Sequence, residues 1–137
     1  MNKKYDANLL QIMLLFEKIT GAKVKDCFEF DETLVFIVEP SQIGIAIGKG
    51  GINLKKLDSV LKRKFKIVEF NSELERFIQN AIYPSQIRGL DNKDNIITLT
   101  PVDMKTRGYL IGRNASNLRM TEAIIKRYFD IKEIKVV

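Results

Sequence analysis

Two glycine-rich turns that contain a basic residue are the parts of this sequence whose residue types suit a defined chemistry. The first lies in the segment Ile47-Gly48-Lys49-Gly50-Gly51-Ile52-Asn53-Leu54, and a similar segment, Ile111-Gly112-Arg113-Asn114-Ala115-Ser116-Asn117-Leu118, follows 64 residues later. Glycine permits positive φ angles and the close approach of another backbone. A basic residue adds charge where backbone N–H groups point outward. Both features favour binding of phosphate groups, and two copies favour a polymer over a single nucleotide.

Residues for catalysis or metal binding are scarce. The sequence has no histidine and one cysteine, Cys27, so the commonest general base and metal ligand is missing. We therefore expect no enzyme, no catalytic residue, no metal and no cofactor, and we interpret Cys27 as an ordinary strand residue. The first turn also fails as a nucleotide-binding P-loop. Three residues instead of four separate Gly44 from Gly48, and Gly50 stands where a hydroxyl would hold magnesium.

The positive charge gathers around the two turns. The chain carries a formal net charge of +6. Residues 40–66 hold seven basic residues against Asp58 alone, and residues 101–127 hold six against two acidic residues, so that the remaining residues are net negative. A uniformly solvated surface would not segregate charge in this way, whereas a nucleic-acid footprint would.

Composition narrows the class of protein. With 45% apolar and 29% charged residues, the chain reads as globular and not as disordered. No apolar run reaches the length of about 18 residues that a membrane span requires, and residues 1–6 lack the apolar core of a signal peptide. We expect a cytoplasmic monomer that has no membrane contact.

The first half of the chain predicts the order helix, two strands, short helix, turn, helix and strand. Asp6 is expected to cap the first helix, which Gly21 ends, with Tyr5 and Leu10 as a hydrophobic staple. The helix carries an apolar face made of Leu9, Leu10, Met13, Phe16 and Ile19. Strands are expected at 23–30 and 34–38, a short helix capped by Ser41, a helix at 51–64 and a strand at 65–70. The expected inward residues of the 51–64 helix are Ile52, Leu54, Leu57, Val60 and Leu61.

The second half repeats this order. A capping box, Ser72 to Glu75, opens a helix, followed by strands at 85–90 and 95–100 with a turn at 91–94. Helices at 103–110 and 115–128 and a strand at 131–136 complete it. A gapless alignment of 41–70 with 105–134 gives ten identities, which indicates a duplication. Units of about 65 residues are marginal alone, so we expect the two to pack together.

This element order, with Ile-Gly-x-x-Gly-x-Asn-Leu at its centre, resembles a KH domain. The helix and strand ahead of the core are similar to the type II arrangement, and the two units together resemble the archaeal NusA-like proteins. The resemblance implies an α+β fold of two tandem type II KH domains, at 1–70 and 71–137. Each would have a three-stranded sheet with helices on one face.

The resemblance also implies a binding site. In KH domains the Gly-x-x-Gly turn clamps the backbone of about four nucleotides of single-stranded RNA, whose bases lie in an apolar groove. Candidates for the groove floor are Ile43, Ile47 and Leu54. The implied RNA-binding residues of the first unit are Ile47, Gly48, Lys49, Gly50, Gly51, Asn53, Lys55 and Lys56. Those of the second unit are Gly112, Arg113, Asn114, Ala115, Asn117 and Arg119.

Two points within this implied site stay open. Ala115 stands where the family has the last glycine of the turn, and its methyl group either holds the RNA backbone further away or distorts the turn. Asn53 and Asn117 either read the edge of a base or hold the turn by bonding to local backbone.

The expected function is binding without catalysis, on nascent transcripts during transcription elongation or termination, with RNA polymerase as a further partner. Two alternatives remain: a KH protein of ribosomal RNA maturation or ribosome assembly, and a protein-docking module for RNA polymerase.

Overall fold

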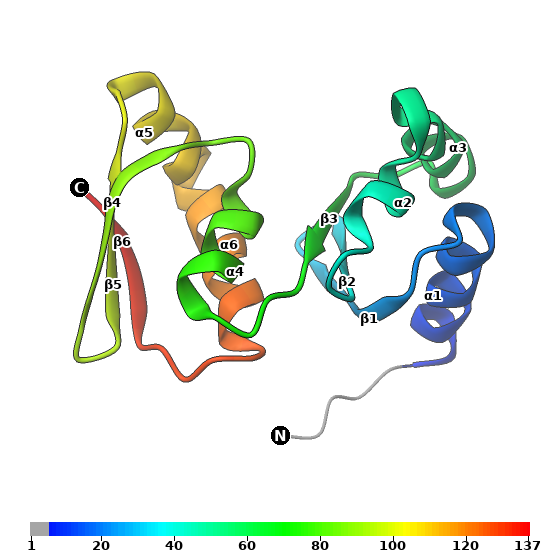
Figure 1. The fold of residues 1–137 in the computed structure, drawn as a ribbon, viewed down its shortest axis with the longest axis horizontal. Coiled ribbons are helices and arrows are strands. Elements are labelled where there is room, and N and C mark those ends of the chain that lie inside the picture. The colour runs from blue at the N-terminus through cyan, green and yellow to red at the C-terminus, as the bar shows by residue number, and fades with distance from the viewer. Residues whose placement is uncertain (1–5) are drawn as a thin grey trace. The chain divides into compact units, whose positions relative to one another are not determined.

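A computed structural model describes residues 6–137. The chain divides into two compact units, with the boundary in the sequence between Phe70 and Asn71. Each unit repeats the order helix, strand, strand, helix, turn, helix, strand along the chain (Figure 1). The structure therefore has the α+β organisation, with two three-stranded sheets, that the sequence predicts. The predicted staple between Tyr5 and Leu10 involves a residue outside the described range.

The first unit is built on a sheet in the order β1-β2-β3. Its elements are α1 (Ala7–Thr20), β1 (Val24–Phe30), β2 (Thr33–Val38), α2 (Ile43–Ile47), α3 (Ile52–Leu61) and β3 (Phe65–Glu69). Strand β1 runs antiparallel to β2, with Cys27 opposite Phe36, and β3 runs parallel to β2. The predicted buried central strand is confirmed, since every residue of β2 from Leu34 to Val38 is buried.

The three helices of the first unit cover one face of this sheet. The ring of Phe16 on α1 stacks on that of Phe36 on β2, with 4.3 Å between centroids. Ala46 of α2 and Leu57 of α3 join the same buried cluster. Leu9 and Met13 also pack against it, but Leu10 is exposed, so its assignment to the apolar face was wrong. The sheet and the three helices thus share one core, and this core holds α2 and α3, the helices on either side of the first turn, in place.

Local bonds explain where the first two helices begin. The Asp6 carboxylate accepts the N–H of Leu9 at 2.8 Å, and Gly21 ends α1 at φ 77°, both as predicted. Ser41 does not cap α2: it has φ 71°, and the helix is preceded by Gln42. The cap comes from elsewhere in the chain, since the Glu69 carboxylate accepts the N–H of Ile43 at 3.2 Å. Strand β3 therefore fixes the start of the helix that leads into the first turn.

The second unit has a sheet in the order β4-β5-β6, with β4 antiparallel and β6 parallel to β5. Its elements are α4 (Leu74–Ile82), β4 (Ile87–Lys93), β5 (Ile96–Pro101), α5 (Met104–Ile111), α6 (Ser116–Lys126) and β6 (Glu133–Val136). Buried residues alternate along β5, where Ile97 and Leu99 lie on the covered face. Phe77 of α4 contacts the ring of Tyr128, with 5.6 Å between centroids.

Two predicted details of the second unit are corrected. The capping box does not form, because α4 begins at Leu74 with Glu73 as its cap residue, so that Ser72 lies one residue too early. The side chain of Asn71 accepts the N–H of Glu73 at 2.8 Å. The β4–β5 turn consists of Asp94 and Asn95, both at positive φ, and not of residues 91–94. Asp and Asn tolerate this conformation, which is that of a two-residue hairpin turn.

The gapless alignment of the two units holds through the helices and fails at the last strand. Three residues separate α3 from β3, whereas six separate α6 from β6. Phe129 and Ile131 consequently lie in a connecting segment, while Phe65 and Ile67, with which they were aligned, lie in β3. Connections tolerate added residues better than the elements that they join, so these identities do not mark equivalent positions.

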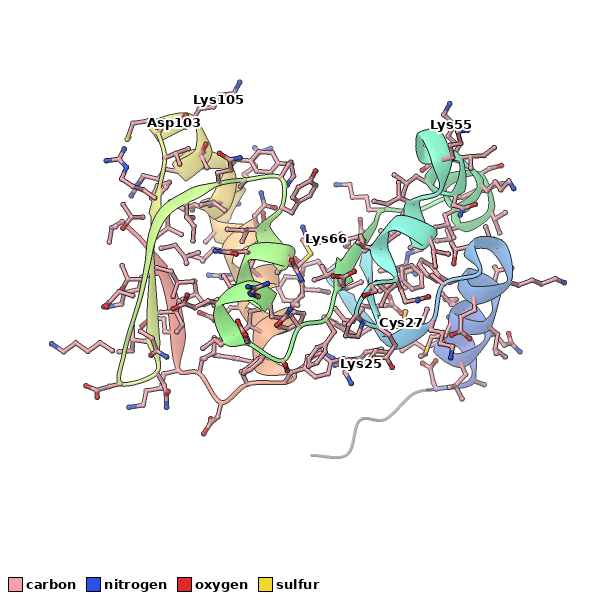
Figure 2. All side chains as sticks on the ribbon, viewed as in Figure 1. Lys25, Cys27, Lys55, Lys66, Asp103 and Lys105 are labelled. Atoms are coloured by element: carbon pink, nitrogen blue, oxygen red, sulfur yellow. The ribbon has the colours of Figure 1, made fainter. Side chains whose placement is uncertain are left out.

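Asp103 supplies a side-chain cap for α5 ahead of the second turn. Its carboxylate accepts the N–H of Thr106 at 2.7 Å, and this hydrogen bond is the main reason that the pKa of Asp103 is below its ordinary value. A carboxyl with a lowered pKa stabilises the fold while it is ionised, and loses that contribution as the pH falls through the folded-state pKa. The cap is therefore in place at neutral pH. Figure 2 labels Asp103 beside the start of α5.

Candidate nucleic-acid interface

The first glycine turn has a backbone path that only glycine adopts without strain. Helix α2 ends at Ile47, after which Gly48 has φ 77° and ψ 165°. Gly50 and Gly51 also have positive φ, at 64° and 74°. Lys49 lies between them in a single 3-10 turn that leads directly into α3. Each glycine of the motif is thus explained by a left-handed or extended positive-φ conformation.

Two adjacent backbone N–H groups take no part in the internal hydrogen bonds of this turn. Gly48 donates to Gly44 at 2.9 Å, Gly51 donates to Gly48 at 3.0 Å, and Ile52 donates to Lys49. Within residues 6–137, the N–H groups of Lys49 and Gly50 have no such acceptor. Successive N–H groups in a turn, at the start of a helix and beside a lysine, favour an anion.

The turn has one packed side and one open side. A Cβ atom added to Gly48 would lie 2.8 Å from Nδ2 of Asn53 and 3.0 Å from Cγ2 of Ile52. A Cβ atom added to Gly50 or Gly51 would meet nothing within 4 Å. The open side is where a phosphate backbone has room to approach.

The second turn keeps the same path although two glycines are replaced. Gly112 has φ 74° and ψ 175°, Asn114 has φ 55°, and Ala115 has φ 61°. Of the two alternatives that the sequence left open for Ala115, the structure does not show a distorted turn. The N–H of Ala115 still donates to Gly112, at 3.2 Å, and this bond holds the alanine in a conformation that asparagine tolerates better. The N–H groups of Arg113 and Asn114 again have no acceptor in the described part of the chain.

Exchanging glycine and alanine at the ends of the two turns should change stability in opposite directions. Ala115→Gly should raise the free energy of unfolding by about 1 kcal/mol and Gly51→Ala should lower it by a similar amount, because a Cβ atom is strained at positive φ. Urea unfolding of the whole chain measures both. Gly44→Ala is the control, since Gly44 lies inside α2 with open space at its Cβ position; that change should stabilise. A destabilising effect of Ala115→Gly would contradict the strain.

The basic residues of the first unit do not all face solvent. Lys49, Lys55 and Lys56 are exposed, and Figure 2 shows Lys55 pointing away from the body of the unit. Arg63, in contrast, lies 3.0 Å from the Glu29 carboxylate and donates to the carbonyl of Glu32. Burial lowers the pKa of Lys66 below its ordinary value. The exposed positive charge next to the turn thus comes from the turn itself and from α3. In the second unit, Arg113 and Arg119 are exposed in corresponding places.

The apolar residues beside the first turn differ in part from those expected. Ile47 and Leu54 are half-buried, whereas Ile43 packs against the core of the first unit. Ile52 and Val60 are half-exposed at 50% each, so their predicted inward orientation was wrong. The cause is helical spacing: Leu57 and Leu61 form the stripe of α3 that packs on the core, and Ile52 lies on the opposite side of the helix. Ile52 is therefore an exposed apolar residue next to the turn. Its position directly after Gly51 is the sequence signal that could have indicated this exposure.

Asn53 and Asn117 occupy matching places at the starts of α3 and α6. Nδ2 of Asn53 donates to the carbonyl of Ile45 at 2.9 Å. Nδ2 of Asn117 donates to the carbonyl of Tyr109 at 2.7 Å. Each asparagine therefore bonds to local backbone across its turn, which is one of the two roles that the sequence left open.

None of the helices in residues 6–137 is long and apolar enough to cross a membrane. That same range contains no group of three or more histidine, cysteine or acidic side chains arranged to hold a metal ion.

Comparisons with known proteins cover both units. Residues 12–75, from α1 into α4, match the family model described as KH domain. A protein of Methanococcus vannielii, named probable transcription termination protein NusA, is 33% identical over 100% of this chain and 81% of its own length. Proteins with the same name from Methanocaldococcus jannaschii and Halobacterium salinarum are 33% and 29% identical, over 89% and 92% of this chain and 68% and 92% of their own lengths.

A solved structure has the same fold. The crystal structure of APE1850 aligns with 97% of this chain and 100% of its own, with a TM-score of 0.77 at 22% sequence identity. Two relatives are 33% identical to this chain over most of its length and over most of their own, and a KH-domain model matches the unit that carries the first turn. This chain therefore belongs to the archaeal NusA-like family.

Proposed function

We propose that this chain is a single-stranded RNA-binding protein of two type II KH domains, residues 1–70 and 71–137, that acts on nascent transcripts. The observation that carries the proposal is the repeated turn, in which two adjacent N–H groups have no acceptor within residues 6–137 and lie beside an exposed basic residue. The names of the relatives, probable transcription termination proteins, support a role in transcription elongation and termination. The protein acts in the cytoplasm as a monomer, without a cofactor and without catalysis.

In the first unit, an RNA phosphate accepts hydrogen bonds from the N–H groups of Lys49 and Gly50, and the Lys49 ammonium adds a charge contact. Ile47 and Leu54, half-buried beside the turn, offer an apolar surface to the bases that follow. Lys55 and Lys56 lie along the exposed side of α3 and contact neighbouring phosphates. Phosphate contacts supply most of the affinity, and the apolar groove supplies a modest preference among bases.

In the second unit, Arg113 and Asn114 offer the equivalent donors, and Arg119 takes the place of Lys55. The difference is the methyl group of Ala115. A Cβ atom at the matching Gly51 would meet nothing within 4 Å, so this methyl occupies space on the open side and keeps the RNA backbone further away. The first turn therefore grips the strand, and the second mainly extends and orients it.

Crosslinking to RNA in cells tests the biological role. A protein of nascent transcripts should give reads spread along messenger and ribosomal precursors behind the polymerase. Reads confined to mature or processing ribosomal RNA would instead support ribosome assembly. A pull-down after nuclease treatment separates the third reading: RNA polymerase retained without RNA would indicate a protein-docking module, and polymerase lost with the RNA would support the proposal.

A further inference from the structure

Each glycine turn is braced by one asparagine, in a contact that the two units repeat. The carbonyls of Ile45 and Tyr109 lie in the last turns of α2 and α5, where an α-helix leaves its carbonyls without helical partners. Asn53 and Asn117, the second residues of α3 and α6, donate to these carbonyls at 2.9 and 2.7 Å. One side chain thus ties the end of one helix to the start of the next.

The first glycine of each turn lies directly against this asparagine. A Cβ atom at Gly112 would come within 2.8 Å of Nδ2 and Cγ of Asn117, as one at Gly48 would with Nδ2 of Asn53. Real Cβ atoms do not approach so closely, and neither asparagine atom is the end of a long flexible chain. The glycine and the asparagine therefore form one packed pair in each unit.

We infer that Asn53 and Asn117 are positioning residues that hold the two turns in their phosphate-binding shape, and not readers of bases. The inference rests on the proposed function, since it assumes that the turns bind RNA. A carbonyl oxygen accepts hydrogen bonds and does not donate them, so the NH₂ group of each asparagine must face it. One of its two N–H bonds is then used within the protein, which fixes the orientation of the side chain toward the end of the preceding helix. An asparagine that reads adenine needs its amide oxygen and an N–H presented together to the base, and a side chain held by the helix end cannot turn freely to present them.

The packed pair of glycine and asparagine keeps the turn in one conformation in the free protein, before RNA binds. With α2 and α3 tied together, the N–H groups of Lys49 and Gly50 are held in an ordered turn without an internal acceptor in residues 6–137, so binding costs little entropy to order them. Without the Asn53 bond, the Ile45 carbonyl loses its partner and the turn gains alternative conformations. RNA then binds more weakly whatever its sequence.

Unfolding of the free protein tests the packed pair without RNA. Gly48→Ala and Asn53→Ala should both destabilise, and the double variant should lose less than the two losses combined, because removing the asparagine side chain relieves its clash with the new Cβ atom. The matched control is Gly50→Ala with Asn53→Ala. A Cβ atom at Gly50 meets nothing, so these two effects should add. Additive effects in both pairs would overturn the inference.

Binding of the whole chain to single-stranded oligo(A), oligo(C) and oligo(U) tests the positioning role. Asn53→Ala should weaken all three by about fivefold, as for one lost hydrogen bond, and make the salt dependence shallower by about 0.7 in slope, as for one lost phosphate contact. Asn8→Ala, on the exposed face of α1, should change neither. A loss confined to one RNA would instead make Asn53 a base reader and overturn the inference. If the wild-type chain binds none of the three while the unfolding data show coupling, the packed pair stands and the proposed function fails.

Discussion

Replacing Lys49 and Gly50 together by aspartate should lower the affinity for single-stranded RNA by about a hundredfold. The change moves the net charge of the first turn by three units, next to the N–H groups that face the phosphate. Each unit charge at about 4 Å from a phosphate is worth about 1 kcal/mol even in water. Asn114 has nearly the same backbone conformation as Gly50, so a side chain at this position is compatible with the turn. Fluorescence anisotropy with a labelled oligonucleotide measures the loss.

The same change in the second unit, Arg113→Asp with Asn114→Asp, should cost clearly less, because the Ala115 methyl already keeps the RNA backbone away. The control is Lys93→Asp with Lys132→Ala, which removes the same charge from exposed residues at the β4–β5 hairpin end of the second unit. It should have a small effect. Equal losses at the two turns would mean that the ranking of the turns is wrong, and losses no larger than in the control would remove both turns from the RNA site.

Raising the salt concentration from 50 to 200 mM should weaken RNA binding about a hundredfold. If each turn and its following helix neutralise two or three phosphates, the slope of log K against log[salt] for the whole chain is roughly −3 to −4. Repeating the titration at four salt concentrations gives this slope directly. The Lys49 and Gly50 double variant should show a shallower slope than the wild type. An affinity that does not change with salt would contradict a phosphate-based mechanism.

The backbone of the candidate site could be predicted from the sequence because glycine positions report φ directly. Gly48, Gly50 and Gly51 all have positive φ, which follows from their residue type and spacing alone. The central strand and the Asp6 cap were predictable for a similar reason, since a β-rich apolar run and an acidic residue ahead of an apolar period are local signals.

Contacts between distant residues could not be predicted in this way. Ser41 has the residue type of a helix cap, yet the N–H of Ile43 at the start of α2 is bound by Glu69, which lies 26 residues after Ile43 in β3. Ser72 is not the cap of α4 because the helix begins one residue later than the motif predicts, after Glu73, and sequence patterns place helix ends only to within a residue or two. Strand β6 begins later in its unit than β3 does, because the connection after α6 is longer than the one after α3. A gapless alignment of the two units cannot show such a difference in length.

The role of Asn53 and Asn117 could not be predicted either, because their hydrogen bonds join residues that are separated by a turn. Asn53 lies eight residues from Ile45, and a glycine turn separates them, so the sequence alone allowed either a base contact or a local bond. The structure shows the bond and its repetition at Asn117. The backbone at Ala115 follows the same path as at Gly51. The sequence alone did not decide whether the alanine distorts the turn or keeps the RNA further away.

The most direct test of the account is a titration of ¹⁵N-labelled protein with a short single-stranded RNA, followed by NMR. In the proposed mechanism, the free N–H groups of the first turn bind phosphate. We expect the largest amide shifts at Lys49 and Gly50, smaller shifts at Arg113 and Asn114, and little change along β4 and β5. Saturating RNA binding that leaves the Lys49 and Gly50 amides unshifted would contradict the account.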